Sequence, residues 1–226
     1  MISIIPVPGL PEIEPDHDLA ALFVETLGED FLRDGDVLVV TQKVVSKAEG
    51  RTADAETKKE VVASESRRML RQVGTMVISE THHGFVCANA GVDESNISEG
   101  TIALLPVDPD ASARRIRSRL EHLTGCDVKV IISDTFGRAW RLGQTDIAIG
   151  VAGMQPFTDY VGTQDTQGRE MRATRICTAD ELAGAAEMVM GKAEGVCAAV
   201  VRGAPVTSGR GAAVQIVRPP GDDLFR

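Results

Sequence analysis

The chain has few aromatic residues and no long apolar segment. Of its 226 residues, one is tryptophan, one is tyrosine and six are phenylalanine. No stretch approaches the roughly 18 consecutive apolar residues that a membrane span needs. The N-terminal segment "MISIIPVPGLPEIEPD" has no basic residues before its short apolar run, which argues against a signal peptide. We therefore expect a cytoplasmic protein without membrane contact.

Basic residues are in deficit, since 24 Lys and Arg face 33 Asp and Glu and the formal net charge is −9. A general nucleic-acid binder needs a basic footprint, so this class is excluded, whereas a small anion held by a few local cations is not. The four cysteines are scattered without a CxxC pair, and the four histidines show no zinc spacing. Reduced thiols in a cytosolic protein are the simplest interpretation.

The common nucleotide and hydrolase motifs are also missing. The chain contains no GxxxxGK[ST] loop, no GxGxxG that follows a strand and opens a helix, and no GxSxG turn. If the protein uses a nucleotide, it binds it by another scheme.

Hydrophobic residues make up 43% of the chain, enough for a buried core. Apolar periodicity and turn residues predict a mixed α/β (α+β) fold without βαβ regularity. We expect a polar excursion at 158–173 and a loop-rich tail at 203–226. The expected strands are 2–7, 36–41, 75–79, 84–91, 127–134, 145–154 and 195–203; the expected helices are 18–27, 110–125 (ending before Gly125) and 179–193, with 54–72 charged and helix-favouring.

Two acids follow apolar strands directly. Asp134 and then Thr135 come after "VIIS", and Asp93 comes after "ANAGV". Carboxylates at strand ends are well placed to reach a ligand at a sheet edge, and two of them could hold Mg²⁺ or Mn²⁺. The same residues could instead only cap turns. The spacing leaves both interpretations open.

The segment "SDTFGRAWRLGQTD" (133–146) concentrates polar residues after a buried strand. Arg138 and Arg141 could clamp a phosphate or carboxylate, or they could pair with a nearby acid such as Asp146. Trp140 between them favours packing over stacking on a ligand. Two glycines in the segment argue against a simple strand.

A basic cluster follows the strand at 36–41. Lys43, Lys47 and Arg51 recur every four residues in "TQKVVSKAEGR". Lysines in this position can reach a nucleotide phosphate, although a solvated surface is the more common outcome. The turn "GLPEI" (9–13) could cradle a base or a phosphate, a weak signal by itself.

Together these segments resemble the coenzyme F420-0:L-glutamate ligase family. The similarity is carried by "GLPEI", "DGDVLVVTQKVVSKAEGR", "AGVDESN", "LLPVDPDASA", "SDTFGRAWRLGQTDIAIGVAG" and "VVRG…RPPGDDLF", and it extends in order over about residues 3–225. The resemblance implies GTP-driven addition of L-glutamate to the lactyl carboxylate of coenzyme F420-0 through an acyl phosphate, with later glutamates joined by γ-linkages. It also implies a fold that is neither a Rossmann fold nor a P-loop fold, and a homodimer with intertwined subunits.

The resemblance further assigns roles to individual residues. It implies two divalent ions, Mg²⁺ or Mn²⁺, with K⁺ as an additional cation. Some archaeal members have an acid or amide at the position of Lys192, a metal ligand that lysine does not readily replace. The implied metal ligands are Asp93, Asp134 and Thr135; the implied catalytic residues are Asp93, Asp134 and Lys47; the implied GTP contacts are Leu10, Pro11, Glu12, Ile13, Gln42, Lys43, Lys47, Asn96, Met190, Gly191 and Lys192.

We expect one ligase domain over residues 1–226, with two interleaved lobes as an option and no C-terminal reductase domain. The expected small-molecule partners are GTP, L-glutamate and coenzyme F420-0. Two other functions remain open, namely a related ligase that acts on another carboxylate and a GTP-binding regulator without catalysis.

Overall fold

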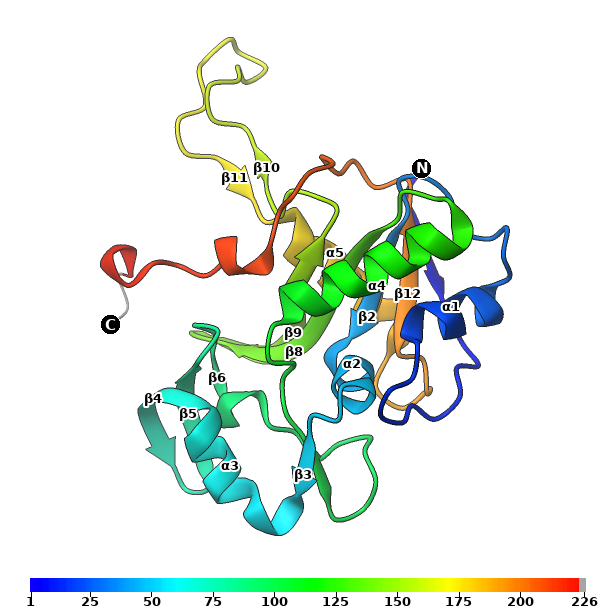
Figure 1. Ribbon diagram of the computed structural model, residues 1–226. Coiled ribbons are helices and arrows are strands. Elements are labelled where there is room, and N and C mark those ends of the chain that lie inside the picture. Colours follow the sequence, from blue (N-terminus) through cyan, green and yellow to red (C-terminus); the bar gives the residue numbers. More distant parts are fainter. Residues whose placement is uncertain (224–226) are drawn as a thin grey trace.

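The computed structural model describes residues 1–223, and a five-stranded sheet lies at its centre (Figure 1). The strand order is β1-β12-β2-β8-β9, in which only β2 and β8 are parallel neighbours. The mixed α/β class predicted from the sequence is confirmed. The strands are β1 (Ser3–Pro6), β2 (Val37–Thr41), β8 (Lys129–Arg138), β9 (Arg141–Ala152) and β12 (Ala198–Arg202).

Helices cover both faces of this sheet. Because side chains alternate along a strand, Leu38 and Val40 of β2 pack on one face, and Val37 and Val39 pack on the other. The first face carries α1 (Leu19–Leu27), the short α2 (Gln42–Ala48) and α4 (Pro109–Thr124); the second carries α5 (Thr178–Met190). The near-continuous apolar composition of β2 and β8 follows from burial on both faces.

The predicted helix at 110–125 is confirmed as α4. Asp108 caps its first turn, since its carboxylate accepts a hydrogen bond from the Ala111 amide at 2.8 Å, and Pro109 occupies the first turn without losing a needed amide. Gly125 takes the left-handed conformation that ends the helix. None of the described helices is long and apolar enough to cross a membrane.

Residues 52–103 form a smaller lobe below the sheet in Figure 1, with its own core around Val62 and Ile102. The helix-favouring interpretation of 54–72 is wrong in its second half, because residues from Ser66 onward pair with β5 and become a strand. Tertiary pairing thus overrides local propensity. The lobe contains β3 (Thr52–Asp54), α3 (Lys58–Glu65), β4 (Ser66–Val73), β5 (Met76–Thr81), β6 (Val86–Ala88) and β7 (Thr101–Ala103).

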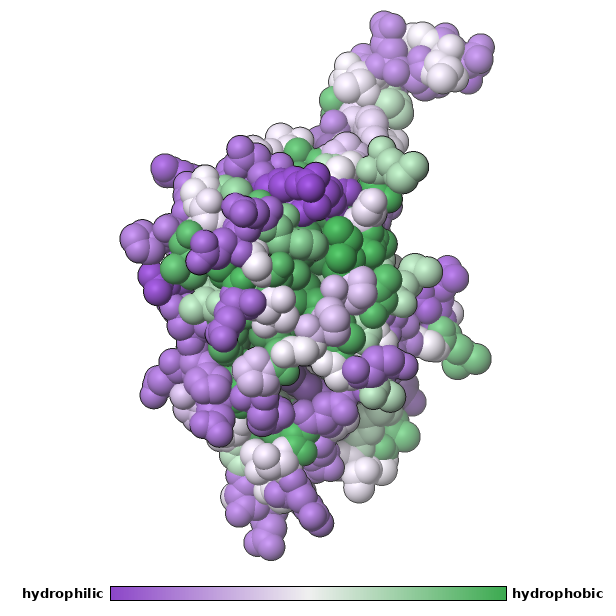
Figure 2. Space-filling view, turned by 90° about the vertical axis from the view of Figure 1, so that its right-hand side faces the viewer, coloured by the Kyte–Doolittle hydropathy of each residue, from purple (hydrophilic) through white to green (hydrophobic). Residues whose placement is uncertain are grey.

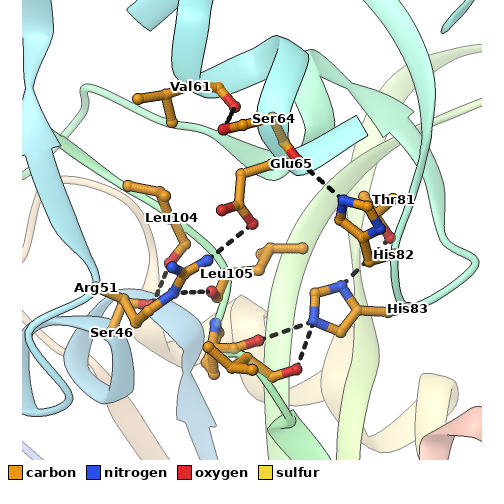
Figure 3. Close-up of polar contacts among 12 residues, drawn as sticks. Ser46, Arg51, Val61, Ser64, Glu65, Thr81, His82, His83, Leu104 and Leu105 are labelled. Atoms are coloured by element: carbon orange, nitrogen blue, oxygen red, sulfur yellow. Dashed lines mark hydrogen bonds and ion pairs between the residues drawn. The ribbon is translucent and has the colours of Figure 1, made fainter. Parts of the chain in front are cut away.

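Polar contacts join this lobe to the chain that leads into α4 (Figure 3). Arg51 donates to the Leu105 carbonyl at 2.9 Å and pairs with Glu65 at 2.8 Å. His83 contacts the Pro106 carbonyl at 2.9 Å, and Ser46 of α2 donates to the Leu104 carbonyl at 2.6 Å. The lobe is therefore fixed against α2, the helix that carries Lys43 and Lys47.

Two projections leave the main body. The segment 133–146 is a hairpin of β8 and β9, contrary to the expectation that its glycines interrupt a strand, and Trp140 adopts a left-handed φ of 64° at its tip. The predicted excursion at 158–173 is confirmed as an arm with β10 (Thr158–Asp159) and β11 (Arg175–Ile176) (Figure 1). The last part of the "DDLF" ending, from Leu224 on, lies outside the described residues.

Candidate active site

One edge of the central sheet collects the chain segments that the sequence singled out. β2 and β8 are parallel and in register from Val37–Lys129 to Thr41–Ser133. At this edge β2 ends, and β8 continues beyond it into the hairpin with β9. β12 is antiparallel to β2, so the loop before Ala198 starts there as well. β1 is antiparallel to β12 and delivers the turn 9–13 to the same edge. Strand carboxyl ends in such sheets commonly form ligand sites.

A cavity of about 820 Å³ opens at this edge. Such a volume falls within the usual range of roughly 300–1,000 Å³ for small-molecule sites. Met190 is the one residue of the expected set that does not line the cavity, because its side chain is buried against the second face of the sheet. The cavity lining includes the other expected residues, namely Leu10, Pro11, Glu12, Ile13, Gln42, Lys43, Lys47, Asp93, Asn96, Asp134, Thr135, Gly191 and Lys192.

Asp93 lies in a tight polar cluster on one wall of the cavity. The Lys43 ammonium is 2.7 Å from its carboxylate, and the amide and hydroxyl of Ser95 each donate to it at 2.9 Å. Burial raises the pKa of Asp93, but the hydrogen bond from Lys43 and the Ser95 amide outweigh it, so the net pKa lies below its usual value. Asp93 is therefore an anion at neutral pH.

Asp134 also lies in the cavity, but fewer hydrogen bonds and positive charges offset the burial of its carboxylate than at Asp93. Desolvation is the largest influence and raises its pKa to about 7, and the neighbouring carboxylates of Asp146 and Asp93 add to the effect. Hydrogen bonding to the Thr135 backbone and the charge of Lys43 act in the opposite direction. A carboxyl group crowded by two others in a low-dielectric position would gain strongly from a cation.

A third carboxylate, Asp146, is buried beside Thr135. The two residues are register partners on β9 and β8, and the Thr135 hydroxyl donates to Asp146 at 2.6 Å. Ser133, on the same face of β8, donates at 3.1 Å. The Lys192 ammonium completes the group at 3.0 Å from Asp146 and 2.7 Å from the Thr135 hydroxyl.

Other contacts tie the cavity walls together. Lys47 pairs with Glu12 of the turn after β1 at 2.6 Å. The Asn96 amide donates to the Lys192 carbonyl at 3.1 Å, which links the lobe to the loop after α5. Gln42 is buried, and its Nε2 has no hydrogen-bond partner among the described residues. An unpaired buried donor in a cavity wall is costly unless a ligand uses it.

Some residues were missed by the sequence analysis, and others lie elsewhere. The sequence predicts Asp146 only as a partner for an arginine, whereas the hairpin over 133–146 places it opposite Thr135. Ser95 was also missed. Neither Arg138 nor Arg141 lines the cavity: Arg138 donates to the Leu142 carbonyl at 3.1 Å near the exposed hairpin tip. Among residues 1–223, the cationic side chains that line the cavity are lysines.

Asp93 and Asp134 could hold one divalent cation, since both line the cavity. Among residues 1–223 Asp134 has no directly bound ammonium, and Asp93 would exchange that of Lys43 for the cation. No group of three or more His, Cys, Asp or Glu side chains in residues 1–223 is arranged to hold a metal ion. Ligand oxygens would then have to complete the coordination, as is usual for Mg²⁺ at phosphate sites. Thr135 fits a metal less well, because its hydroxyl already donates to Asp146 and accepts from Lys192.

Comparison with known proteins places the chain among ligases. The family model described as F420-0:Gamma-glutamyl ligase matches residues 9–203. The chain therefore belongs to this family. It is 42% identical over 250 residues to the coenzyme F420:L-glutamate ligase of Methanothermobacter thermautotrophicus, covering 100% of this chain and 99% of that protein. The protein of the same name from Methanocaldococcus jannaschii is 41% identical over 222 residues, 89% of each chain. The one from Archaeoglobus fulgidus is 39% identical over 245 residues, 100% of this chain and 96% of the relative.

Proposed function

We propose that the protein is a GTP-dependent ligase that joins L-glutamate to coenzyme F420-0 and then adds further γ-linked glutamates. The observation that carries the proposal is the cavity itself, where Asp93 and Asp134 face three lysines, Lys43, Lys47 and Lys192. Acids that can hold a divalent ion, surrounded by ammonium groups, suit a nucleoside triphosphate. The family membership supports coenzyme F420-0 and L-glutamate as the other two substrates.

A carboxylate is a poor electrophile, so amide formation needs activation. In the proposed reaction an oxygen of the lactyl carboxylate attacks the γ-phosphorus of GTP, and the bond from that phosphorus to the GDP oxygen breaks. The amine of glutamate then attacks the acyl carbon of the resulting acyl phosphate. The amide bond forms, inorganic phosphate leaves, and the amine gives up a proton. The net change is one amide bond per GTP.

The residues of the cavity have distinct parts in this reaction. Asp93 and Asp134 would hold Mg²⁺ or Mn²⁺, which supplies positive charge to the phosphate oxygens when bound. Lys47 would exchange its partner Glu12 for the phosphates, and the Glu12 side chain, which is 72% exposed, would then be solvated by water. Leu10, Pro11 and Ile13 form a wall against the nucleotide. Gln42 also lines this part of the cavity, and its buried Nε2 has no hydrogen-bond partner among the described residues.

We further propose that two copies of the chain associate. The hairpin tip exposes Trp140 at 86% and Leu142 at 98% of their surfaces, and β4 exposes Met69 at 62%. Apolar groups of this size on a projecting hairpin favour burial against a partner surface. β1 is also an edge strand of the sheet, and apolar side chains gather on the side of the molecule seen in Figure 2.

The proposal is tested by following GDP release and product mass with purified full chain, coenzyme F420-0, L-glutamate and Mg²⁺ or Mn²⁺. We expect GDP formation to require both acceptor and glutamate, and the product to gain one glutamyl residue at a time. ATP should give a much lower kcat/KM than GTP, because a site that hydrogen-bonds one base edge penalises the other.

The same assay separates the alternatives. GDP release with glutamate and a different carboxylate, but not with coenzyme F420-0, would identify a related ligase. Tight GTP binding without turnover under any combination would identify a regulator. Either outcome would contradict the proposed function.

A further inference from the structure

The Lys192 ammonium occupies a pocket that has the form of a cation site. Its nitrogen lies 2.7 Å from the Thr135 hydroxyl, 3.0 Å from the buried Asp146 carboxylate and 3.6 Å from Glu187. These are hard oxygen ligands from β8, β9 and α5, the kind that Mg²⁺, Mn²⁺ or K⁺ would take. In this chain a side chain supplies the positive charge instead.

The surrounding hydrogen bonds and the charge of Lys192 disfavour a second ion on the same oxygens. The Thr135 hydroxyl has one proton, which it gives to Asp146 at 2.6 Å, and it accepts from Lys192. Asp146 accepts in addition from Ser133 at 3.1 Å. A metal at Thr135 would have to displace Lys192 and leave its ammonium without these partners, beside another positive charge.

From this geometry we propose that Lys192 is a built-in cation that replaces a second metal ion, so that each cavity binds one divalent ion, at Asp93 and Asp134. The proposal deepens the proposed function and rests on it for the statement that the anion facing Lys192 is a triphosphate. Lys192 has three N–H donors, and the two contacts within 3.0 Å leave the third to reach a phosphate oxygen in the cavity.

The anchoring of the loop supports the same role. Lys192 follows α5 and Gly191, whose φ of 60° turns the chain at the helix end. Its carbonyl accepts a hydrogen bond from Asn96 at 3.1 Å. The backbone of Lys192 is therefore held by Asn96, and its ammonium is held by Thr135 and Asp146.

The experiment counts Mn²⁺ ions bound per full chain by electron paramagnetic resonance of free Mn²⁺, first without nucleotide. Lys192→Gln removes the charge and frees Asp146 and Thr135, so we expect it to bind one more ion per chain than the wild type. Lys192→Arg retains the charge and should bind the wild-type number. Lys59→Gln, an exposed lysine of α3 outside the cavity, is the matched control and should also leave the count unchanged.

A second set of variants locates the additional ion. Adding Asp146→Asn to Lys192→Gln should return the count to the wild-type value. Equal counts in wild type and Lys192→Gln, with both folded by circular dichroism, would overturn the inference. So would a wild-type count of two, with one ion lost in Asp146→Asn.

Repeating the count with a non-hydrolysable GTP analogue separates this inference from the proposed function. One ion per chain in the wild-type complex, after subtraction of a nucleotide-only blank, supports the inference, and two would overturn it. Failure of the analogue to bind at all would count against the proposed function, while the nucleotide-free comparison of Lys192→Gln with wild type would still decide the role of Lys192.

Discussion

The substitution Asp134→Asn should stabilise the metal-free protein while removing its response to metal. The Asp134 carboxyl has a pKa of about 7 in the folded protein, raised from 3.8 by desolvation and by the Asp146 and Asp93 carboxylates. Between these two values the folded state binds a proton that the unfolded state has lost. The free energy of unfolding therefore decreases as pH rises through this window.

The size of the effect follows from the shift. A difference of about three pKa units corresponds to about 4 kcal/mol once Asp134 is fully ionised. Asparagine is neutral but its amide must also be desolvated, so we expect about 2 kcal/mol of this to be recovered. For a chain of this length the increase in Tm is about 4–8 °C. The gain should be present at pH 8 and vanish near pH 4, where aspartate is protonated in both states.

Thermal unfolding of wild type and Asp134→Asn, measured by circular dichroism from pH 4 to 8 without metal, checks this expectation. Asp127→Asn is a control of opposite sign, because hydrogen bonds from Lys129 and Arg117 lower the pKa of Asp127, so its loss should destabilise at neutral pH. Adding Mn²⁺ should raise the Tm of the wild type and of Asp127→Asn, but not that of Asp134→Asn. A Tm for Asp134→Asn at or below the wild-type value at pH 8 would refute the reasoning.

Two further predictions concern stability and assembly. The buried Asp110 carboxylate accepts hydrogen bonds from the amides of Val151, Ala213 and Val214 at 2.8, 2.7 and 3.2 Å. Asp110→Ala should reduce the free energy of unfolding by about 3 kcal/mol, because three amides lose their acceptor. An unchanged midpoint of urea unfolding would contradict this. The double substitution of Trp140 and Leu142 to serine should shift the chain from dimer to monomer in analytical ultracentrifugation without unfolding it, whereas a wild-type chain that is already monomeric would contradict the proposed association.

Local patterns predicted most of the elements of the central sheet correctly. The apolar run before Asp134 and the capped amphipathic pattern at 110–125 depend on residues close in sequence, so β8 and α4 follow from periodicity and capping alone. The segment after Glu65 misled because its residues favour a helix in isolation, and only pairing with β5 makes them a strand. The glycines of 133–146 likewise predict a break, but the pairing of β8 with β9 carries the strands through them.

The candidate site was predicted in part for a similar reason. Asp93, Asp134 and Lys43 could be selected because each comes shortly after an apolar run in the sequence, although Asp134 lies within β8 and Lys43 within α2 in the structure. The pairing of Lys43 with Asp93, across a gap of fifty residues in sequence, could not be deduced from spacing. The role of Asp146 was likewise hidden, since it depends on the register of β9 against β8.

The sequence alone determined which acidic and basic side chains the chain contains, which family it resembles, and which apolar runs are followed by polar residues. These properties depend only on residue type and on the order of neighbouring residues. Only the tertiary structure decided which charges neutralise one another. It assigned Lys192 to Asp146 and Thr135, kept Arg138 and Arg141 out of the cavity, and left Asp134 short of positive charge. The physical reason is that electrostatic and hydrogen-bond energies depend on separation and burial, which are fixed only when distant segments pack together.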